Sequence, residues 1–403
     1  MLLQLLCLMF LVPALLCCAY YLFLAAVELL VCQERELPRR NATHTFAILI
    51  PAHNEETALP AALHACADLD YPADKFKTYV VADNCTDHTA AVAAAAGAVV
   101  LERRDEKHPG KGLALAWALP HVLADRPDAV VVLDADCRLD QHALRAFDER
   151  LSAGDAVLQA NYVAVNPEDS AISYAIAVGN QLENDLFYSP KSRLGLAVLL
   201  RGTGMVFRRD VLERHPWQAY SVTEDTEYTL ELLRAGTRVR FLSQVRVVSD
   251  FPAHAEQLRV QRQRWAAGNL RFGKTWALSL IGEAVAARRG DLFDLGWTLL
   301  VLSRPLVLAE ALAALVLAVL CVWIEPDALS AALLATGLAV ILLQGLYLML
   351  GIVRLGVNSR RLLLLAGSGI AFGRLLTATL RGLCERGRPA WTRTPRPLEQ
   401  ASR

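Results

Sequence analysis

Three long segments of the chain are almost wholly apolar, and the residues between the first two have the mixed pattern of a soluble domain. The apolar segments cover residues 1–31, 305–324 and 328–353. About 20 consecutive apolar residues suffice for a helix to cross a bilayer. We therefore predict three transmembrane helices, with a globular domain between the first and the second.

A fourth apolar segment, residues 362–373, is shorter. It covers only about two-thirds of the length that a helix needs to cross the hydrocarbon core, and Arg361 and Arg374 bound it. We predict an interfacial or re-entrant helix at this position.

Basic residues lie on one side of the predicted spans. Arg35, Arg39 and Arg40 follow the first span, and Arg354 and Arg360 follow the last. The positive-inside rule puts these flanks in the cytoplasm. The first segment lacks the basic start of a secretory signal, so we predict an anchor. The globular domain is then cytoplasmic, in a multi-pass protein of the inner (plasma) membrane.

These patterns divide the chain into five parts. The predicted parts are an N-terminal transmembrane anchor (1–34), a cytoplasmic domain (35–272), interfacial helices (273–302), two transmembrane helices (303–353), and an interfacial helix with a basic cytoplasmic tail (354–403). The hydrophobic fraction of 54% is high for a soluble protein and agrees with this division.

Short apolar runs alternate with helical patterns in the first half of the globular domain. Strands are predicted at 45–51, 78–82, 98–101 and 129–133, and helices at 59–67, 88–96 and 112–124. This alternation is typical of a doubly wound parallel sheet, hence of an α/β fold. Ligands of such sheets bind at the carboxyl ends of the strands. The polar residues that follow each strand are therefore candidates for a functional site.

The strand at 129–133 ends in two acids, Asp134 and Asp136. Strand alternation would send both side chains to the same side of the sheet. Mg²⁺ or Mn²⁺ usually takes one or two protein carboxylates and completes its coordination with water and substrate phosphate. The pair alone is equally typical of a surface turn after a core strand.

Polar residues also follow the first two strands and precede a helix. His53 and Glu55 lie in the turn after the first strand, and Asp83 follows the second. An acid there can hold a ribose or a base, although a loop cap is the alternative. Lys111 lies between two glycines just before a helix, where it could reach a diphosphate. An ordinary helix-entry loop is the alternative, since the segment does not match a P-loop.

Three acids open the helix that begins near residue 224. Thr223 precedes Glu224 and Asp225, and Glu227 follows. The helix dipole favours an acid in the first turn, which accounts for one of them without any chemistry. Three acids exceed what capping needs.

Gln261, Arg264 and Trp265 fall on one face of a predicted helix, by their i, i+3, i+4 spacing. One interpretation is a substrate-binding face. The other is an amphipathic helix on lipid headgroups, with the tryptophan as an interfacial anchor.

Composition excludes some classes of partner. The formal net charge is zero, so nothing points to nucleic acid. The nine cysteines lack metal-ligand spacing, and we interpret them as small apolar residues in a reducing compartment.

Together these motifs resemble the membrane-integrated family 2 glycosyltransferases, which include cellulose, chitin, hyaluronan and poly-N-acetylglucosamine synthases and the ceramide glucosyltransferases. The resemblance rests on residues 51–56 (Pro-Ala-His-Asn-Glu-Glu), Asp83, residues 110–112 (Gly-Lys-Gly), residues 134–136 (Asp-Ala-Asp), residues 223–225 (Thr-Glu-Asp) and the pattern Gln261-x-x-Arg264-Trp265. It implies a nucleotide-diphospho-sugar transferase (GT-A, Rossmann-like) domain with transmembrane helices at both ends. His53 departs from the tyrosine that polysaccharide synthases often have, and no regulatory domain is expected after the last span.

The resemblance also implies roles for the candidate residues. His53, Glu55 and Asp83 would surround the uridine of a UDP-sugar. Lys111 and Asp134 would lie at its diphosphate, and Asp136 with Asp134 would hold Mg²⁺ or Mn²⁺.

The resemblance makes Asp225 the general base, with Glu224 as its competitor for that role. Arg264 would steady the departing diphosphate. Gln261, Trp265 and Thr223 would form the acceptor end.

Three functions remain open. The first is inverting transfer from a UDP-sugar of the glucose or N-acetylglucosamine type to a growing β-linked polysaccharide, which would need an oligomer or a partner subunit because three spans hardly enclose a polymer. The second is a single transfer to a membrane lipid. The third is an inactive scaffold or sugar-nucleotide sensor, which the retained acids and Arg264 disfavour. The expected partners are thus the donor, a carbohydrate or lipid acceptor, and membrane lipids.

Overall fold

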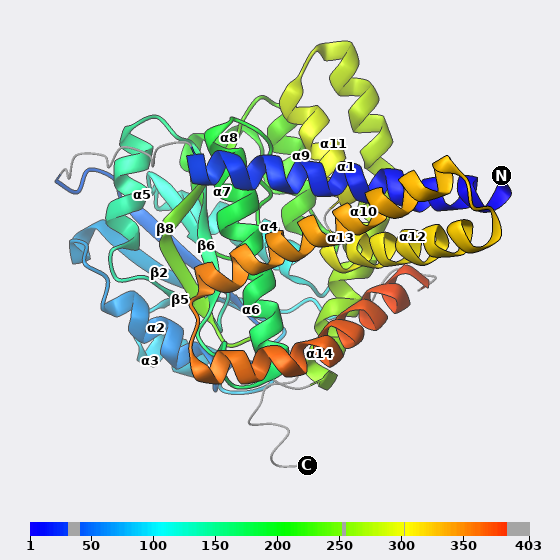
Figure 1. The fold of residues 1–403 in the computed structure, drawn as a ribbon. Helices are drawn as coiled ribbons and strands as arrows, with labels where there is room; N and C mark the ends of the chain where they lie inside the picture. Colours follow the sequence, from blue (N-terminus) through cyan, green and yellow to red (C-terminus); the bar gives the residue numbers. More distant parts are fainter. Residues whose placement is uncertain (31–40, 252–254, 302, 385–403) are drawn as a thin grey trace.

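The computed structural model describes residues 1–30, 41–251, 255–301 and 303–384, with side chains except at 255–267, 378 and 382–384. Figure 1 shows an α/β domain from which a group of long helices projects. The strands are β1 (Phe46–Ala52), β2 (Phe76–Asp83), β3 (Val99–Arg103), β4 (Ala129–Val132), β5 (Arg138–Leu139), β6 (Val157–Ala164), β7 (Met205–Arg208) and β8 (Val239–Ser249). The helices of the domain are α2 (Leu59–Ala67), η1 (Ala73–Lys75), α3 (Thr89–Ala95), α4 (Lys111–Ala124), α5 (Ala143–Ser152), α6 (Ala171–Glu183), the π-helix η2 (Asn184–Tyr188), α7 (Ser189–Arg193), α8 (Arg209–Arg214) and α9 (Glu224–Arg234). The remaining helices are α1 (Leu2–Leu30), α10 (Ala255–Ala287), α11 (Gly290–Val301), α12 (Arg304–Ile324), α13 (Ala328–Leu355) and α14 (Ser359–Cys384).

The described strands form one eight-stranded sheet in the order β3-β2-β1-β4-β7-β6-β8-β5. The first four are parallel, as the β–α alternation predicts. Strand β7 runs antiparallel to both β4 and β6, and β5 runs antiparallel to β8. The sheet is therefore mixed, and its parallel half is the half in which strands and helices alternate in the sequence.

Both faces of the sheet are covered. Apolar side chains of β1, β2 and β4 alternate between two hydrophobic clusters. One cluster joins the sheet to α2, α3 and α5. The other joins it to α4 and α9 and continues into α1, α10 and α11. Helix α1 and the domain thus share one core, because side chains from the second half of α1, such as Tyr21 and Leu24, are buried in it.

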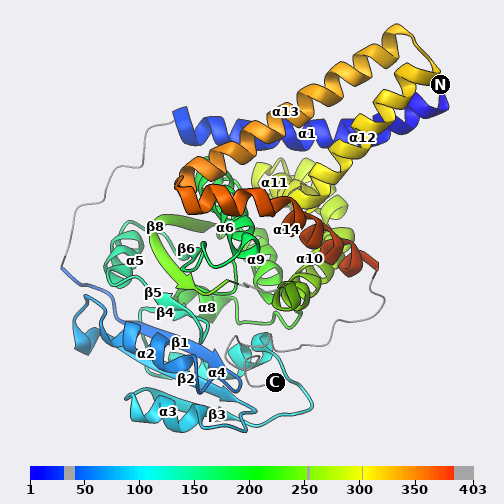
Figure 2. The ribbon, with the colours of Figure 1, turned by 60° about the horizontal axis from the view of Figure 1, so that its bottom comes forward.

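Helices α1, α12 and α13 pack together and project from the domain (Figure 2). Their contact is lined by small or apolar side chains that are fully buried, including Cys7, Ala14, Ala314 and Ala318. By length and composition each is long enough to cross a membrane, as predicted.

Helix α14 differs from the prediction. Residues 362–373 are the middle of a helix that continues through Arg374 to Cys384, so α14 is a fourth helix long and apolar enough to span. Its Ala371 and Leu375 pack against Ile172 of α6 in the domain. The bounding arginines do not end the helix, since arginine is a good helix former, and the contact of Leu375 with α6 stabilises the part of the helix after residue 373.

A buried charge pair joins the domain to α1 and α11. The Nζ atom of Lys191 lies 2.9 Å from a carboxylate oxygen of Asp294 in α11 and 2.5 Å from the hydroxyl of Thr298. The same carboxylate accepts hydrogen bonds from the hydroxyl of Tyr20 in α1 and from the backbone N–H of Ala197, the latter at 2.9 Å. Each charge is thus matched, and the network fixes α1 and α11 to the domain.

Candidate active site

Two carboxylates converge just beyond β4. The potential ligand atoms of Asp134, Asp136 and Cys137 all lie within 4.8 Å of one another. The backbone N–H of Cys137 donates to the carbonyl oxygen of Asp134 at 3.0 Å. The convergence was predicted, but strand alternation does not cause it, because β4 ends at Val132 and a tight turn brings the acids together.

This donor set suits a hard divalent cation. Mg²⁺ and Mn²⁺ prefer carboxylate oxygens. Burial raises the pKa of the Cys137 thiol well above its usual value, so the thiol stays protonated, and its Sγ lies 3.5 Å from Oδ1 of Asp136 as a donor. Cys137 therefore orients Asp136, and the two carboxylates fit the metal.

Lys111, the first residue of α4, reaches the same cluster. Its Nζ contacts the Asp134 carboxylate, donates to the carbonyl oxygen of Gly202 at 2.6 Å, and lies 3.9 Å from Oε1 of Glu224. Burial acts to lower the pKa of Lys111, but the charges of Asp134 and Glu224 outweigh burial and raise it. Lys111 is therefore a permanent cation among acids.

Glu224 and Asp225 begin α9 beside this lysine. Burial, together with the charge of Asp225, raises the pKa of Glu224 to about 8, so Glu224 holds its proton at neutral pH. Burial also raises the pKa of Asp225, but the backbone N–H of Thr226 donates to its carboxylate at 2.7 Å and favours the charged form. Of the two acids, Asp225 is the better placed to accept a proton.

Two glycines let the backbone approach these acids. A Cβ on Gly112 would lie 2.3 Å from the carbonyl oxygen of Ala219, which precedes α9. Gly202 has a φ of +77°, and a Cβ there would lie 3.3 Å from Nζ of Lys111 and 3.6 Å from Oδ2 of Asp225. Gly202 thus borders the site, and the lack of a side chain there permits the close approach of its backbone to Lys111 and Asp225.

The loop before β7 contributes residues that the sequence analysis did not assign to the site. The hydroxyl of Thr203 accepts the backbone N–H of Asp134 at 3.1 Å. The Gln159 amide donates to the Thr203 carbonyl and accepts the Arg201 N–H, each at 2.9 Å. The glycines on either side of Thr203 were the only feature of the sequence that pointed to this loop, because the hydrogen-bond partners of Thr203 are distant in sequence.

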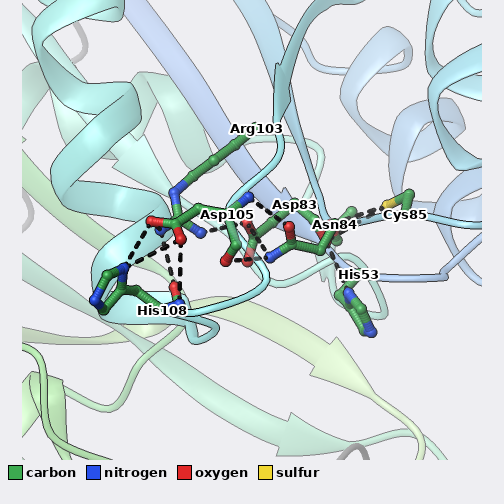
Figure 3. Close-up of polar contacts among 8 residues, drawn as sticks. His53, Asp83, Asn84, Cys85, Arg103, Asp105 and His108 are labelled. Atoms are coloured by element: carbon green, nitrogen blue, oxygen red, sulfur yellow. Dashed lines mark hydrogen bonds and ion pairs between the residues drawn. The ribbon is translucent and has the colours of Figure 1, made fainter.

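Asp83 lies at the end of β2, where its carboxylate is already engaged (Figure 3). Arg103 is its register partner at the end of β3 and donates to it at 2.6 Å. The same guanidinium donates to the carboxylate of Asp105 at 3.0 Å and to the carbonyl oxygen of His108 at 2.9 Å. Asn84 adds hydrogen bonds to the backbone of Asp105. Asp83 thus anchors the loop that leads to Lys111, and the sequence analysis missed Arg103.

The turn after β1 packs against the same edge. A ring nitrogen of His53 (Nδ1) lies 2.7 Å from the carbonyl oxygen of Asp83 and is therefore its donor (Figure 3). Glu55 is buried, and its backbone N–H donates to the hydroxyl of Thr89 at 2.8 Å. His53 thus lies beside Asp83, at the edge where the sequence predicts a nucleotide, and Glu55 contacts the start of α3.

The side chains of Gln261, Arg264 and Trp265 lie outside the described residues, although the backbone of α10 includes all three. Further along the same helix, a Cβ on Gly268 would lie 2.6 Å from Cγ2 of Thr223. Helix α10 therefore passes directly against Thr223, the residue that precedes the acids of α9.

Comparisons with known proteins agree on one family. The sequence model described as "Glycosyltransferase like family 2" matches residues 44–268, more than half of the chain. The chain is 25% identical over 281 residues to the beta-monoglucosyldiacylglycerol synthase of Nostoc sp., covering 65% of this chain and 57% of that protein. It is 25% identical over 237 residues to the cellulose synthase 1 catalytic subunit of Komagataeibacter xylinus, covering 57% of this chain and 31% of that protein. The matches thus span about half or less of these relatives' own lengths.

A solved structure matches nearly the whole chain. The mannosyltransferase PcManGT from Pyrobaculum calidifontis, in complex with GDP-Man and Mn²⁺, aligns with a TM-score of 0.61 over 95% of this chain and 99% of that one, at 20% identity. The predicted GT-A fold with membrane-type helices is confirmed by this likeness.

Proposed function

The chain belongs to glycosyltransferase-like family 2, an enzyme family that uses nucleotide sugars, and we propose that it transfers one sugar from a UDP-sugar to a lipid acceptor. The donor sugar we expect is of the glucose or N-acetylglucosamine type. The packing of α1, α12 and α13 is the observation that favours a lipid acceptor over a growing polymer.

The space between these three helices is filled. Ala14 of α1 and Ala311, Ala314 and Ala318 of α12 are each at most 1% exposed, and Leu333 of α13 is 4% exposed. Close packing of small side chains is typical of helices that associate within a membrane. A polysaccharide would need a wide polar path through the membrane, but the space between these three helices in one copy is filled by apolar side chains. A lipid acceptor needs only a site at the membrane surface.

Asp225 is the proposed general base. Its carboxylate takes the proton of the acceptor hydroxyl as that oxygen attacks the anomeric carbon from the face opposite UDP, which gives inversion. Glu224 keeps its proton at neutral pH and so limits the negative charge beside the base. Thr223, with Gln261 and Trp265 on α10, forms the proposed acceptor end.

Lys111 and Arg264 are the proposed partners of the diphosphate, because each can offset the charge that develops on the leaving group. Asp134 and Asp136 would hold Mg²⁺ or Mn²⁺, which would supply further charge neutralisation there. His53, Glu55 and Asp83 are proposed to surround the uridine. Arg103 is added to this set as the residue that fixes Asp83.

The proposed orientation follows the arginines around the spans. With Arg35, Arg39 and Arg40 after the first span and Arg354 at the end of α13, the domain would face the cytoplasm of an inner (plasma) membrane. UDP-sugars would then reach the site from the cytoplasm.

A second candidate is extension of a β-linked polysaccharide. The similarity to a cellulose synthase catalytic subunit favours it. Because the bundle of one copy is closed, this function would require several copies or a partner subunit to form the path.

The two functions differ in product. We would supply detergent-purified protein with Mn²⁺, a total lipid extract, and UDP-glucose, UDP-N-acetylglucosamine or GDP-mannose carrying a labelled sugar. One labelled lipid that does not grow with time is the expected result. Label in a ladder or a high polymer would instead establish the polysaccharide function.

A further inference from the structure

Helices α10 and α11 form a hairpin that lies across the direction of α1 and α12 rather than along it (Figure 1). Exposed apolar side chains repeat at i, i+7 on each helix: Leu278 (76% exposed) and Val285 (67%) on α10, and Phe293 (44%) and Leu300 (51%) on α11. Residues seven apart lie on the same face of a helix. A hairpin across the spanning bundle with apolar outer faces suits the plane of the membrane surface.

A cavity of about 770 Å³ lies at the turn of this hairpin. Arg288 and Arg289 line it from the turn, and Arg238 lines it from the end of the segment that follows α9. Leu194, which is 44% exposed, belongs to the same lining. The cavity thus combines guanidinium groups with an apolar side chain, beside helices that present apolar surface.

The two acids that line the cavity, Asp155 and Asp291, are each paired with an arginine. Asp155 is paired with Arg150 at 2.7 Å. Asp291 is paired with Arg289 at 2.7 Å, and Arg289 also donates to the carbonyl oxygen of Leu233. These contacts account for both acids and give Arg289 a structural role.

Arg238 and Arg288 supply the excess positive charge. The Arg238 side chain is 62% exposed and approaches Asp291 only to 3.8 Å, and Arg288 is exposed at a φ of +53° on the turn. Guanidinium groups bind phosphate oxygens through paired N–H donors.

We propose that this cavity binds the phosphate of an anionic membrane lipid, at a site separate from the candidate active site. The lipid, rather than free phosphate, is favoured by the apolar faces of the hairpin. Helix α11 begins at the cavity and ends at Val301, close in sequence to Arg304, where the candidate spanning helix α12 begins, so the hairpin connects the cavity to the predicted membrane segment. The lipid acyl chains would lie along the hairpin, and its headgroup would occupy the cavity.

The test uses the full chain in a neutral detergent with equal amounts of phosphatidylglycerol and phosphatidylcholine, followed by quantification of the lipid retained after gel filtration. The test variant is Arg238→Gln with Arg288→Asn, since asparagine tolerates the left-handed backbone of position 288. The control, Arg104→Gln with Arg214→Gln, removes two exposed arginines away from the hairpin. A basic residue near an anionic lipid surface contributes about fivefold in binding, so losing both predicts about 25-fold weaker binding of phosphatidylglycerol.

Preferential retention of phosphatidylglycerol by the wild type and the control, but not by the test variant, is the expected result. Equal retention by all three proteins would overturn the proposal. Competition by millimolar inorganic phosphate as effective as that by the lipid would also overturn it, in favour of a soluble anion. Arg238→Lys, which keeps the charge, should retain most binding and separates loss of charge from misfolding. The readout does not involve sugar transfer, so it is independent of the proposed function.

Discussion

Two lysines of this protein, the fully buried Lys191 and the partly buried Lys111, have opposite surroundings. Lys191 is fully buried and faces one acid, Asp294, whose second oxygen accepts the hydroxyl of Tyr20. Lys111 is 20% exposed and lies among several acids, in contact with Asp134 and near Glu224 and Asp225. Lys191 therefore has one acid as its partner, whereas Lys111 has more acids around it than its single charge can neutralise.

We propose that this difference separates charges that support the fold from charges that take part in the chemistry. When a buried charge is paired with one opposite charge, the protein loses stability mainly if one of the two partners is removed. An excess of acids destabilises the folded state by repulsion and raises their pKa values, which is a frequent property of functional sites. We therefore expect changes around Lys191 to affect stability, and changes around Lys111 to affect activity.

The largest effect should follow Asp294→Asn, which leaves the Lys191 charge buried without its counterion. Loss of one partner of a buried pair predicts a decrease of about 3–5 kcal/mol in the free energy of unfolding. Denaturant unfolding in detergent measures it. Asp210→Asn, in a half-exposed pair with Arg208 and Arg214, is the control and should cost less than about 1 kcal/mol. Equal losses in both variants would contradict the comparison.

Asp136→Asn removes one proposed metal ligand. Because a metal at a leaving diphosphate contributes several kcal/mol to transition-state stabilisation, we expect transfer to fall by about 100-fold or more. Mn²⁺ binding, followed by electron paramagnetic resonance, should weaken in parallel while stability is kept. Asp140→Asn, a neighbouring acid outside the cluster, should bind Mn²⁺ normally. Unchanged Mn²⁺ affinity in Asp136→Asn would remove this residue from the metal site.

Gly202→Ala should affect the site through the backbone. A left-handed conformation costs a residue with a Cβ about 1–2 kcal/mol, and the new methyl would crowd Lys111, so kcat/KM should fall roughly tenfold. Gly97→Ala is a matched control, because Gly97 has a φ of +79° and nothing within 4 Å of an added Cβ. That variant should lose stability but keep its activity. Equal losses of activity in the two variants would exclude a local effect.

The smallest effect at neutral pH is expected for Glu224→Gln, because glutamine resembles the protonated acid. Burial raises the pKa of Glu224 to about 8. Above this pH the wild type gains a second negative charge beside Asp225, and its rate should fall. The Glu224→Gln variant has no such group and should lack this alkaline decrease. A decrease at the same pH in both proteins would assign it to another residue.

The sequence predicts what depends on local patterns. Helix α2 coincides with its predicted bounds, and the acids at 134, 136, 224 and 225 were singled out because each follows a strand or opens a helix. The pairing of Lys191 with Asp294 joins residues that are distant in sequence, and no periodicity indicates it. The role of Arg103 was likewise not predictable from a local pattern, because it depends on the register that places Arg103 of β3 beside Asp83 at the end of β2.

Tertiary packing also explains the differences in the elements. Strand β8 (Val239–Ser249) was not predicted, although it pairs with β6 across a register shift after Ala160. Its polar residues interrupt the apolar run that we used to identify strands. Helix α14 extends beyond its apolar segment because α6 packs against one of its faces. The pattern of apolar and polar residues within one segment predicts neither feature, because each depends on packing against another segment.

The most direct test of the account is nucleotide release by Asp225→Asn, measured with donor, lipid extract and Mn²⁺ and expressed per amount of folded protein. Loss of the general base predicts a decrease of roughly 10²–10⁴-fold, with Mn²⁺ binding and unfolding like those of the wild type. Nucleotide release at the wild-type rate would contradict the assignment of the base and, with it, the interpretation of the acids around Lys111 as the catalytic centre.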